Sequence, residues 1–274
     1  TELWAHNASN HSTWRATDIN TASGGGNDNT NPGYYFSILV GDTLYFSARQ
    51  GSQDTEPWAY DTSNHSTWRV ADISSGFTSS IPGQFMSILV GDTIYFDAIG
   101  GTSGNELWAH DTSNYSTWLV ADIWPQSNVG SVPGQHMSML VGDTIYFDAD
   151  DGVNSRELWA HQPAEITTLS SGSGSGSNSG TYNGNGTAWM VNDIRSGSGG
   201  SSPGHLTVVG NTLYFTAHDG TNGIELWKSD GTSSGTVMVK NIQSGGSSSS
   251  SSPNHLTAVG NTLYFTANDG TNGI

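Results

Sequence analysis

The sequence predicts an all-β fold, a five-bladed β-propeller built from four-stranded antiparallel blades. Three observations lead to this prediction. A repeat of about 50 residues runs along the chain, each repeat holds four short segments rich in β-branched and aromatic residues, and no segment shows sustained helical periodicity. Four strands in a repeat of this length are typical of a propeller blade.

A Glu-Leu-Trp triplet marks each repeat, with Pro57 in place of Leu once. Successive triplets are separated by 54, 50, 51 and 68 residues. A Gly-Asp/Asn-Thr turn, a Tyr-Phe pair and a proline recur in phase with them. We expect the tryptophans of the triplets to pack in the core, because large side chains fill the space between blades. These tryptophans are Trp4, Trp58, Trp108, Trp159 and Trp227.

The elements of one repeat follow in order from its sequence. Residues 205–217 (HLTVVGNTLYFTA) contain two β-rich runs joined by a Gly-Asn pair, which is a hairpin signal. Residues 219–223 (DGTNG) predict a glycine-rich turn. Residues 224–229 (IELWKS) and 236–242 (TVMVKNI) predict the third and fourth strands. We name the four strands A to D in this order.

The two ends of the chain predict how the last blade is built. The chain begins with a C–D pair, at 2–6 and 13–19, and it ends with an A–B pair, at 255–267. We therefore expect a closed ring in which the N- and C-terminal strand pairs complete the fifth blade, since closure removes exposed sheet edges. The alternative is an open arc or a fragment of a longer array.

We expect residues 1–274 to form a single propeller domain. Its repeats cover about 1–55, 56–105, 106–156, 157–224 and 225–274. Residues 170–186 consist mostly of Ser, Gly and Asn. This composition predicts a flexible loop, and its insertion accounts for the 68-residue spacing.

Two segments carry a family resemblance. ELWKSDGTSSGTVMVKNI (225–242) and VGNTLYFTAHDGTNGIELW (209–227) resemble the ELWxxDGT repeat of secreted or surface proteins of bacteria and archaea. The match is looser in the first three repeats, where DGTxxGT becomes, for example, DTSNHSTW (61–68). The resemblance covers nearly the whole chain outside the Ser/Gly loop. It implies a propeller-like module outside the cell or on its surface, and it implies no particular reaction or ligand.

Composition excludes several classes of function. Seven Lys and Arg against 24 Asp and Glu give a net charge of −17, which disfavours nucleic acid as a partner because phosphate contacts need basic side chains. The chain has no cysteine, so disulfides, Cys-ligated zinc and thiol catalysis are excluded. No apolar run approaches the roughly 20 residues of a membrane span, so we expect no membrane insertion.

Carboxylates recur at two repeat positions. Five of the six glutamates occupy one repeat position, two residues before a Trp, and aspartate or asparagine ends each strand D. A ring of carboxylates that binds cations is one interpretation. The favoured one is that each side chain accepts hydrogen bonds from a neighbouring backbone, since a position shared by all repeats usually serves the repeat itself. The glutamates are Glu2, Glu56, Glu106, Glu157 and Glu225.

The most acidic segment is FDADDGVN (147–154), with Asp148, Asp150 and Asp151. Clustered oxygens of this kind suit Ca²⁺, although the spacing of known calcium loops is missing. These three aspartates are the predicted metal ligands, and Ca²⁺ is the one cofactor that the sequence suggests.

Aromatic residues supply the predicted ligand-binding positions, because exposed rings can stack on sugars. A second set of tryptophans begins strand D, and two further aromatics interrupt the repeat in the connections between blades. Histidines begin three of the A strands, where they would line the central channel, but a three-histidine metal site is disfavoured by aromatic replacements in two repeats. The predicted ligand-binding residues are Trp14, Trp68, Trp118, Trp189, Trp124 and Tyr34. The aligned residues at the start of strand A are Tyr35, Phe85, His136, His205 and His255.

Five Asn-x-Ser/Thr sequons are candidate glycosylation sites, and four of them fall in the expected C–D turns. The sequons begin at Asn7, Asn10, Asn64, Asn114 and Asn185.

These features predict a non-catalytic recognition or adhesion module outside the cell or on its surface. Equivalent positions in every repeat suit repeated, carbohydrate-binding sites between blades better than one asymmetric reaction centre. The expected partners are glycans or other surface molecules, with self-association as a further option. The alternatives are a structural module that builds surfaces or filaments and, third, a glycoside hydrolase.

Overall fold

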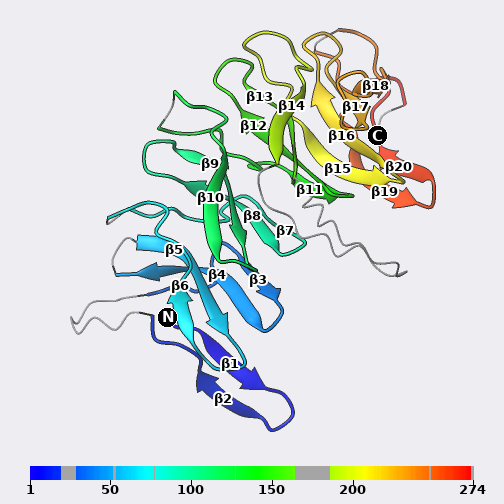
Figure 1. The fold of residues 1–274 in the computed structure, drawn as a ribbon. Helices are drawn as coiled ribbons and strands as arrows, with labels where there is room; N and C mark the ends of the chain where they lie inside the picture. Colours follow the sequence, from blue (N-terminus) through cyan, green and yellow to red (C-terminus); the bar gives the residue numbers. More distant parts are fainter. Residues whose placement is uncertain are drawn as a thin grey trace, which may run out of the picture.

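The computed structural model of the chain describes residues 1–19, 29–51, 54–76, 78–126, 128–163, 186–246 and 248–272. Within these ranges all regular elements are β-strands, arranged as six antiparallel sheets (Figure 1). Four sheets have four strands and two sheets, at the ends of the chain, have two. The predicted all-β class and the four-stranded blades are confirmed.

Each four-stranded sheet is a blade whose strands follow one another in chain order. Blade 1 contains β3 (Ser37–Val40), β4 (Thr43–Gln50), β5 (Asp54–Asp61) and β6 (Thr67–Arg69). Blade 2 contains β7 (Ser87–Val90), β8 (Thr93–Ile99), β9 (Asn105–Asp111) and β10 (Ser116–Ala121). Blade 3 contains β11 (Ser138–Val141), β12 (Thr144–Asp150), β13 (Arg156–Gln162) and β14 (Thr187–Asn192). Blade 4 contains β15 (Gly204–Val209), β16 (Thr212–His218), β17 (Ile224–Ser229) and β18 (Val237–Lys240).

Two hairpins stand at the ends of the chain. The N-terminal hairpin pairs β1 (Trp4–Asn7) with β2 (Ser12–Arg15), and the C-terminal hairpin pairs β19 (Asn254–Val259) with β20 (Thr262–Thr266). Both were predicted as strand pairs from the repeat, and their positions agree with the prediction within a few residues.

The predicted closure of the ring is wrong for this structure. The two hairpins form separate sheets and lie at opposite ends of an open arc of blades (Figure 1). Each hairpin packs on the neighbouring complete blade instead, with Leu3 and Ile19 against blade 1 at one end and β19 beside β15 at the other. Closure depends on the rotation between successive blades, and side-chain packing sets this rotation rather than any local sequence signal.

Hydrophobic layers between successive blades hold the arc together. At the junction of blades 3 and 4, Tyr146 and Leu158 of one blade pack against Phe215 and Trp227 of the next. The junctions of blades 1 and 2 and of blades 2 and 3 repeat this arrangement. Within each complete blade a phenylalanine of strand B lies opposite the tryptophan of strand C. The pairs are Phe46 with Trp58, Phe96 with Trp108, Phe147 with Trp159 and Phe215 with Trp227.

The core role predicted for the first tryptophan set holds in the complete blades. Trp58 and Trp227 are buried, and Trp108 and Trp159 are half-buried against the inter-blade layers. Trp4 departs from this prediction, since 61% of its surface is exposed. No blade among the described residues covers that face of its hairpin.

The flexible loop predicted at 170–186 lies outside the described residues except for Gly186. Among the described residues, no helix has the length and apolar character that crossing a membrane requires.

Candidate functional site

The repeated glutamates tie each blade to the connection that follows it. In the complete blades the glutamate side chain is fully buried. Glu106 accepts hydrogen bonds from the backbone N–H of Ile123 at 3.0 Å and from the hydroxyl of Ser131 at 2.6 Å. Ile123 follows strand D, and Ser131 precedes the next strand A, so the carboxylate connects three segments. Glu56, Glu157 and Glu225 make the equivalent bonds.

Burial in this position disfavours the charged form of the carboxylate. Desolvation raises the pKa of Glu56 and of Glu157 to about 7, although the hydrogen bonds act in the opposite direction. The pKa of Glu106 is raised for the same reason. These contacts agree with the structural interpretation of the glutamates rather than with a cation-binding ring.

The segment that each glutamate holds leads into a strained turn. The residue after the buried Ser or Thr precedes a proline and has a positive φ, between 44° and 48°, in all five connections. Left-handed backbone at a non-glycine residue costs of order 1 kcal/mol or more and is often found at binding sites. The residues with this conformation are Asn31, Ile81, Val132, Ser202 and Ser252.

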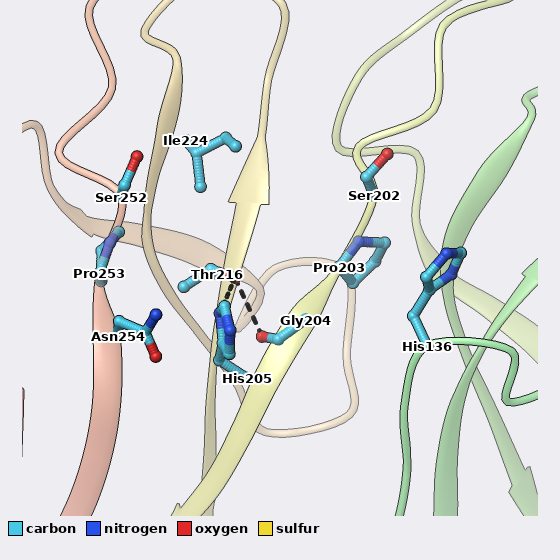
Figure 2. A pocket seen from close by; sticks show the side chains of 10 residues that line it. All are labelled: His136, Ser202, Pro203, Gly204, His205, Thr216, Ile224, Ser252, Pro253 and Asn254. Atoms are coloured by element: carbon cyan, nitrogen blue, oxygen red, sulfur yellow. Dashed lines mark hydrogen bonds between the residues drawn. The ribbon is translucent and has the colours of Figure 1, made fainter.

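A pocket of about 400 Å³ lies where these turns meet the start of strand A. Two consecutive turns, residues 202–205 and 252–254, supply most of its wall (Figure 2). His136 of the preceding connection lies across the 202–205 segment from Asn254. His205 bonds through Nδ1 to the hydroxyl of Thr216 at 3.3 Å. We call this the His205 pocket.

A buried aspartate orients His136. Asp148 is fully buried on strand B and accepts a hydrogen bond from the backbone N–H of His136 at 3.1 Å. Its other oxygen lies 2.8 Å from His136 Nδ1 and 2.8 Å from an Arg156 nitrogen. Because Nδ1 is held in this way, Nε2 is the ring nitrogen that a ligand can reach.

Two further pockets also lie beside residues that begin an A strand. One, of about 250 Å³, is lined by Thr30, Asn31, Tyr34, Tyr35, Arg49 and Thr55 beside blade 1, and we call it the Tyr34 pocket. The other, of about 470 Å³, is more open and extends from Phe85 past His136 to His205. In the Tyr34 pocket the two tyrosine rings are perpendicular, with centroids 4.8 Å apart.

Of the six predicted ligand-binding residues, Tyr34 alone lines one of these three pockets. Trp68, Trp118 and Trp189 are half-buried and pack against the hydrophobic layers between blades. Trp14 is 37% exposed on the N-terminal hairpin. Trp124 packs so closely on Gly152 that a Cβ there would lie 2.1 Å from its indole nitrogen.

The structure places His136 and His205 at the pockets, and neither was among the predicted site residues. The sequence did contain a signal for them. A histidine or another aromatic residue begins strand A in every repeat, two or three positions after the proline that recurs in each repeat.

The predicted calcium ligands are engaged within the chain. Asp148 has the partners given above. Asp150 accepts a hydrogen bond from Gly152, and Asp151 accepts bonds from the backbone of Val153 and Asn154, which is an Asx turn. The structure does not gather the three aspartates around one point, and calcium binding stays a prediction.

One acidic group among the described residues does bring three possible ligand atoms together. It consists of Asp54, Glu56 and Asp72, with those atoms within 4.8 Å of one another. Arg69 binds Asp54 and Asp72 at 2.8 Å each, so one guanidinium already occupies both aspartates and offsets part of their charge. The remaining acid, Glu56, is held by backbone and serine donors.

The sequons at Asn10, Asn64 and Asn114 lie in exposed turns, and Asn7 is half-buried. The side-chain amide nitrogens of Asn64 and Asn114 donate to Asp61 and Asp111. Asn185 lies outside the described residues.

No protein-family model matches the chain, and no curated protein sequence matches it. Solved structures do resemble it at low identity. The computationally designed Ika8 protein is 14% identical, with a TM-score of 0.41 and coverage of 86% of this chain and 56% of that one. BamB from Moraxella catarrhalis is 15% identical, with a TM-score of 0.40 and coverage of 94% and 60%.

An α-L-arabinofuranosidase from Clostridium thermocellum is 13% identical, with a TM-score of 0.30 and coverage of 74% of this chain and 70% of the enzyme. The chain spans less than two thirds of the length of Ika8 and of BamB. The all-β architecture of repeated four-stranded blades is shown by the sheets of this chain themselves.

Proposed function

We propose that the protein is a non-catalytic recognition module that binds carbohydrate in the pockets between successive blades. It would act outside the cell or on its surface, where glycans are accessible partners. The net charge of −17 favours neutral sugars over phosphate-rich ligands, because it repels anions.

The observation that carries this proposal is the recurrence of one pocket wall in different blades. Asn31 lines the Tyr34 pocket, and Ser202 and Ser252 line the His205 pocket. All three residues occupy the same repeat position and share the same left-handed backbone. Equivalent walls with different side chains suit a set of related binding sites.

The chemistry of the walls suits sugars. Hydroxyl, amide and imidazole groups of Ser202, Asn254 and His205 can exchange hydrogen bonds with sugar hydroxyls, while Pro203 and Ile224 offer apolar surface. In the Tyr34 pocket, Arg49 and the two tyrosines combine a donor with aromatic faces.

The same walls favour binding over hydrolysis. Glycosidases generally use two carboxyl groups that flank the scissile bond. None of the described residues that line the three pockets is Asp or Glu. The buried glutamates nearby are held by backbone and serine donors.

A glycan array, followed by calorimetric titration with the best sugar, tests the proposal. We expect His205→Ala and Tyr34→Ala to weaken binding, each at its own pocket. Trp14→Ala is the matched control, because Trp14 is exposed and lies outside the three pockets. The absence of any binding sugar, or binding that Trp14→Ala abolishes and the pocket variants leave intact, contradicts the proposal. Turnover of a glycoside would instead make the protein an enzyme.

A further inference from the structure

An aromatic residue stands at the start of strand A in every repeat, and in blades 2, 3 and 4 it lines one groove. Phe85, His136 and His205 occupy this position, and all three line the open pocket of about 470 Å³. His136 and His205 also line the His205 pocket, so the two pockets share part of their wall. We call the larger pocket the strand-A groove. It extends across three complete blades.

A buried aspartate on strand B holds the backbone beneath two of these rings. Asp97 accepts hydrogen bonds from the backbone N–H of Phe85 and of the next residue, at 2.9 Å each. Asp148 accepts the equivalent bonds from His136 and the residue after it, at 3.1 Å each. Both aspartates are fully buried. The start of the strand is therefore fixed against its own blade, and positioning it before a ligand arrives lowers the entropic cost of binding.

The hydrogen bonds of the two histidines also decide which ring nitrogen carries the proton. Asp148 is an acceptor for an arginine and for two backbone N–H groups, so Nδ1 of His136 is the donor in the 2.8 Å bond between them. Thr216 donates its hydroxyl hydrogen to a backbone carbonyl of strand A at 3.1 Å, so it accepts from Nδ1 of His205 (Figure 2). In a neutral imidazole with a proton on Nδ1, Nε2 is an acceptor. Both exposed histidines therefore offer Nε2 to hydroxyl donors.

The rest of the groove alternates apolar and uncharged polar groups. Met139 and Leu206 line it and pack against the hydrophobic layer between blades 3 and 4. Gln135 and Ser138 add an amide and a hydroxyl. Of the residues that line the groove, none that the structure describes is Asp, Glu, Lys or Arg. A neutral sugar has apolar C–H faces and hydroxyl edges, so this wall is complementary to it in both respects.

The extent of the groove favours a ligand larger than one sugar. Its wall begins at Phe85 on blade 2 and reaches Leu206 on blade 4. The volume of about 470 Å³ lies within the roughly 300–1,000 Å³ of pockets that hold drug-sized ligands. A single sugar contacts only part of such a wall, whereas a chain of sugars contacts an aromatic ring on each blade.

We propose, on the basis of the carbohydrate binding proposed above, that the strand-A groove binds a neutral oligosaccharide, such as a stretch of a longer glycan chain, rather than a single sugar. Apolar faces of its sugar units stack on Phe85 and on the two histidine rings. Its hydroxyl groups donate to Nε2 of His136 and of His205. The ligand thus runs across blades 2 to 4, with one ring contact on each blade.

Calorimetric titration with the best neutral sugar, as the monosaccharide and as its hexasaccharide, tests this ligand class. Phe85 lines the groove and not the His205 pocket. We expect Phe85→Leu, which keeps an apolar side chain, to lower the affinity for the hexasaccharide about tenfold, because one stacked ring is worth roughly that factor. The affinity for the monosaccharide should fall less than about twofold. Tyr115→Ala is the matched control and should change neither affinity, because Tyr115 is 64% exposed and lies outside the three pockets.

Two results separate this ligand class from carbohydrate binding as such. If Phe85→Leu weakens both sugars equally, or neither, the oligosaccharide groove is overturned while the proposed function stands. If no sugar of any length binds, both are overturned, and a peptide that binds the groove instead would show what it holds. Nuclear magnetic resonance gives a second measurement on the wild type. The hexasaccharide should shift the ring signals of Phe85, His136 and His205 together, and shifts confined to one ring overturn the proposal.

Discussion

Replacing Glu157 by Gln tests whether burial controls the charge of the repeated glutamates. The carboxylate of Glu157 accepts bonds from the backbone N–H of Ile194 and from both the N–H and the hydroxyl of Ser201. A Gln side chain has one acceptor oxygen, so it cannot satisfy all three donors. We expect Glu157→Gln to destabilise the fold at pH 4.5, by roughly 1–3 kcal/mol.

The pH dependence of that loss is the sharper measurement. Burial raises the pKa of Glu157 from the usual 4.5 to about 7. The folded state therefore holds its proton more tightly than the unfolded state. The stability that this group contributes is complete below pH 4.5 and is lost as the pH rises through 7. At about 1.4 kcal/mol per pKa unit, the wild type should lose about 3 kcal/mol relative to Glu157→Gln across this window.

Urea unfolding followed by tryptophan fluorescence, at several pH values between 4.5 and 8, gives the free energy of unfolding of both proteins. The difference between them isolates Glu157, because every other titrating group is common to both. The gap should be widest at the acidic end. A gap that does not change with pH, or that widens toward pH 8, would refute the assignment of a raised pKa to burial.

Three further predictions concern a histidine, two glycines and two tryptophans. Burial lowers the pKa of His161 to about 4, so its contribution to stability is complete above pH 6.5 and is lost toward pH 4. In the same urea series the gap between wild type and His161→Gln should therefore narrow on acidification, and a gap that widens contradicts this. Gly152→Ala places a Cβ 2.1 Å from a tryptophan side chain at φ 77°, and it should lower the free energy of unfolding by about 2–4 kcal/mol. Gly142→Ala, at φ 60° with open space around the Cβ, should cost about 1 kcal/mol, and equal losses would count against the packing argument. Trp58 is buried, so Trp58→Ala should lower the free energy of unfolding by about 3–5 kcal/mol. Trp4 is exposed, so Trp4→Ala should lower it by less than about 1 kcal/mol, and urea unfolding measures both.

Much of the local structure could be predicted because each strand carries its own signal. The run at 224–229 was predicted as a strand and forms β17, and the Gly-Asn pair before it in the repeat joins β15 to β16. Turn chemistry and alternating burial act over a few residues, so one sequence suffices to find them.

The site was harder to predict for a physical reason. Trp68 and Trp118 were expected to contact a ligand, but their side chains pack against the hydrophobic layers between adjacent blades. His205 and Asn254 come from different connections and share a pocket only because two blades stand side by side. Such proximity is a property of the packed structure and leaves no trace in the spacing of residues.

The sequence by itself determined the repeat, the order of strands A to D and the structural use of the buried glutamates, because these depend on contacts within one blade and its own connection. The tertiary structure alone decided that the arc stays open, that Trp4 and Tyr264 are exposed, and that the turns preceding strand A form pockets. All three depend on the angle between blades. That angle results from many small packing contacts summed over the arc, so no single motif encodes it.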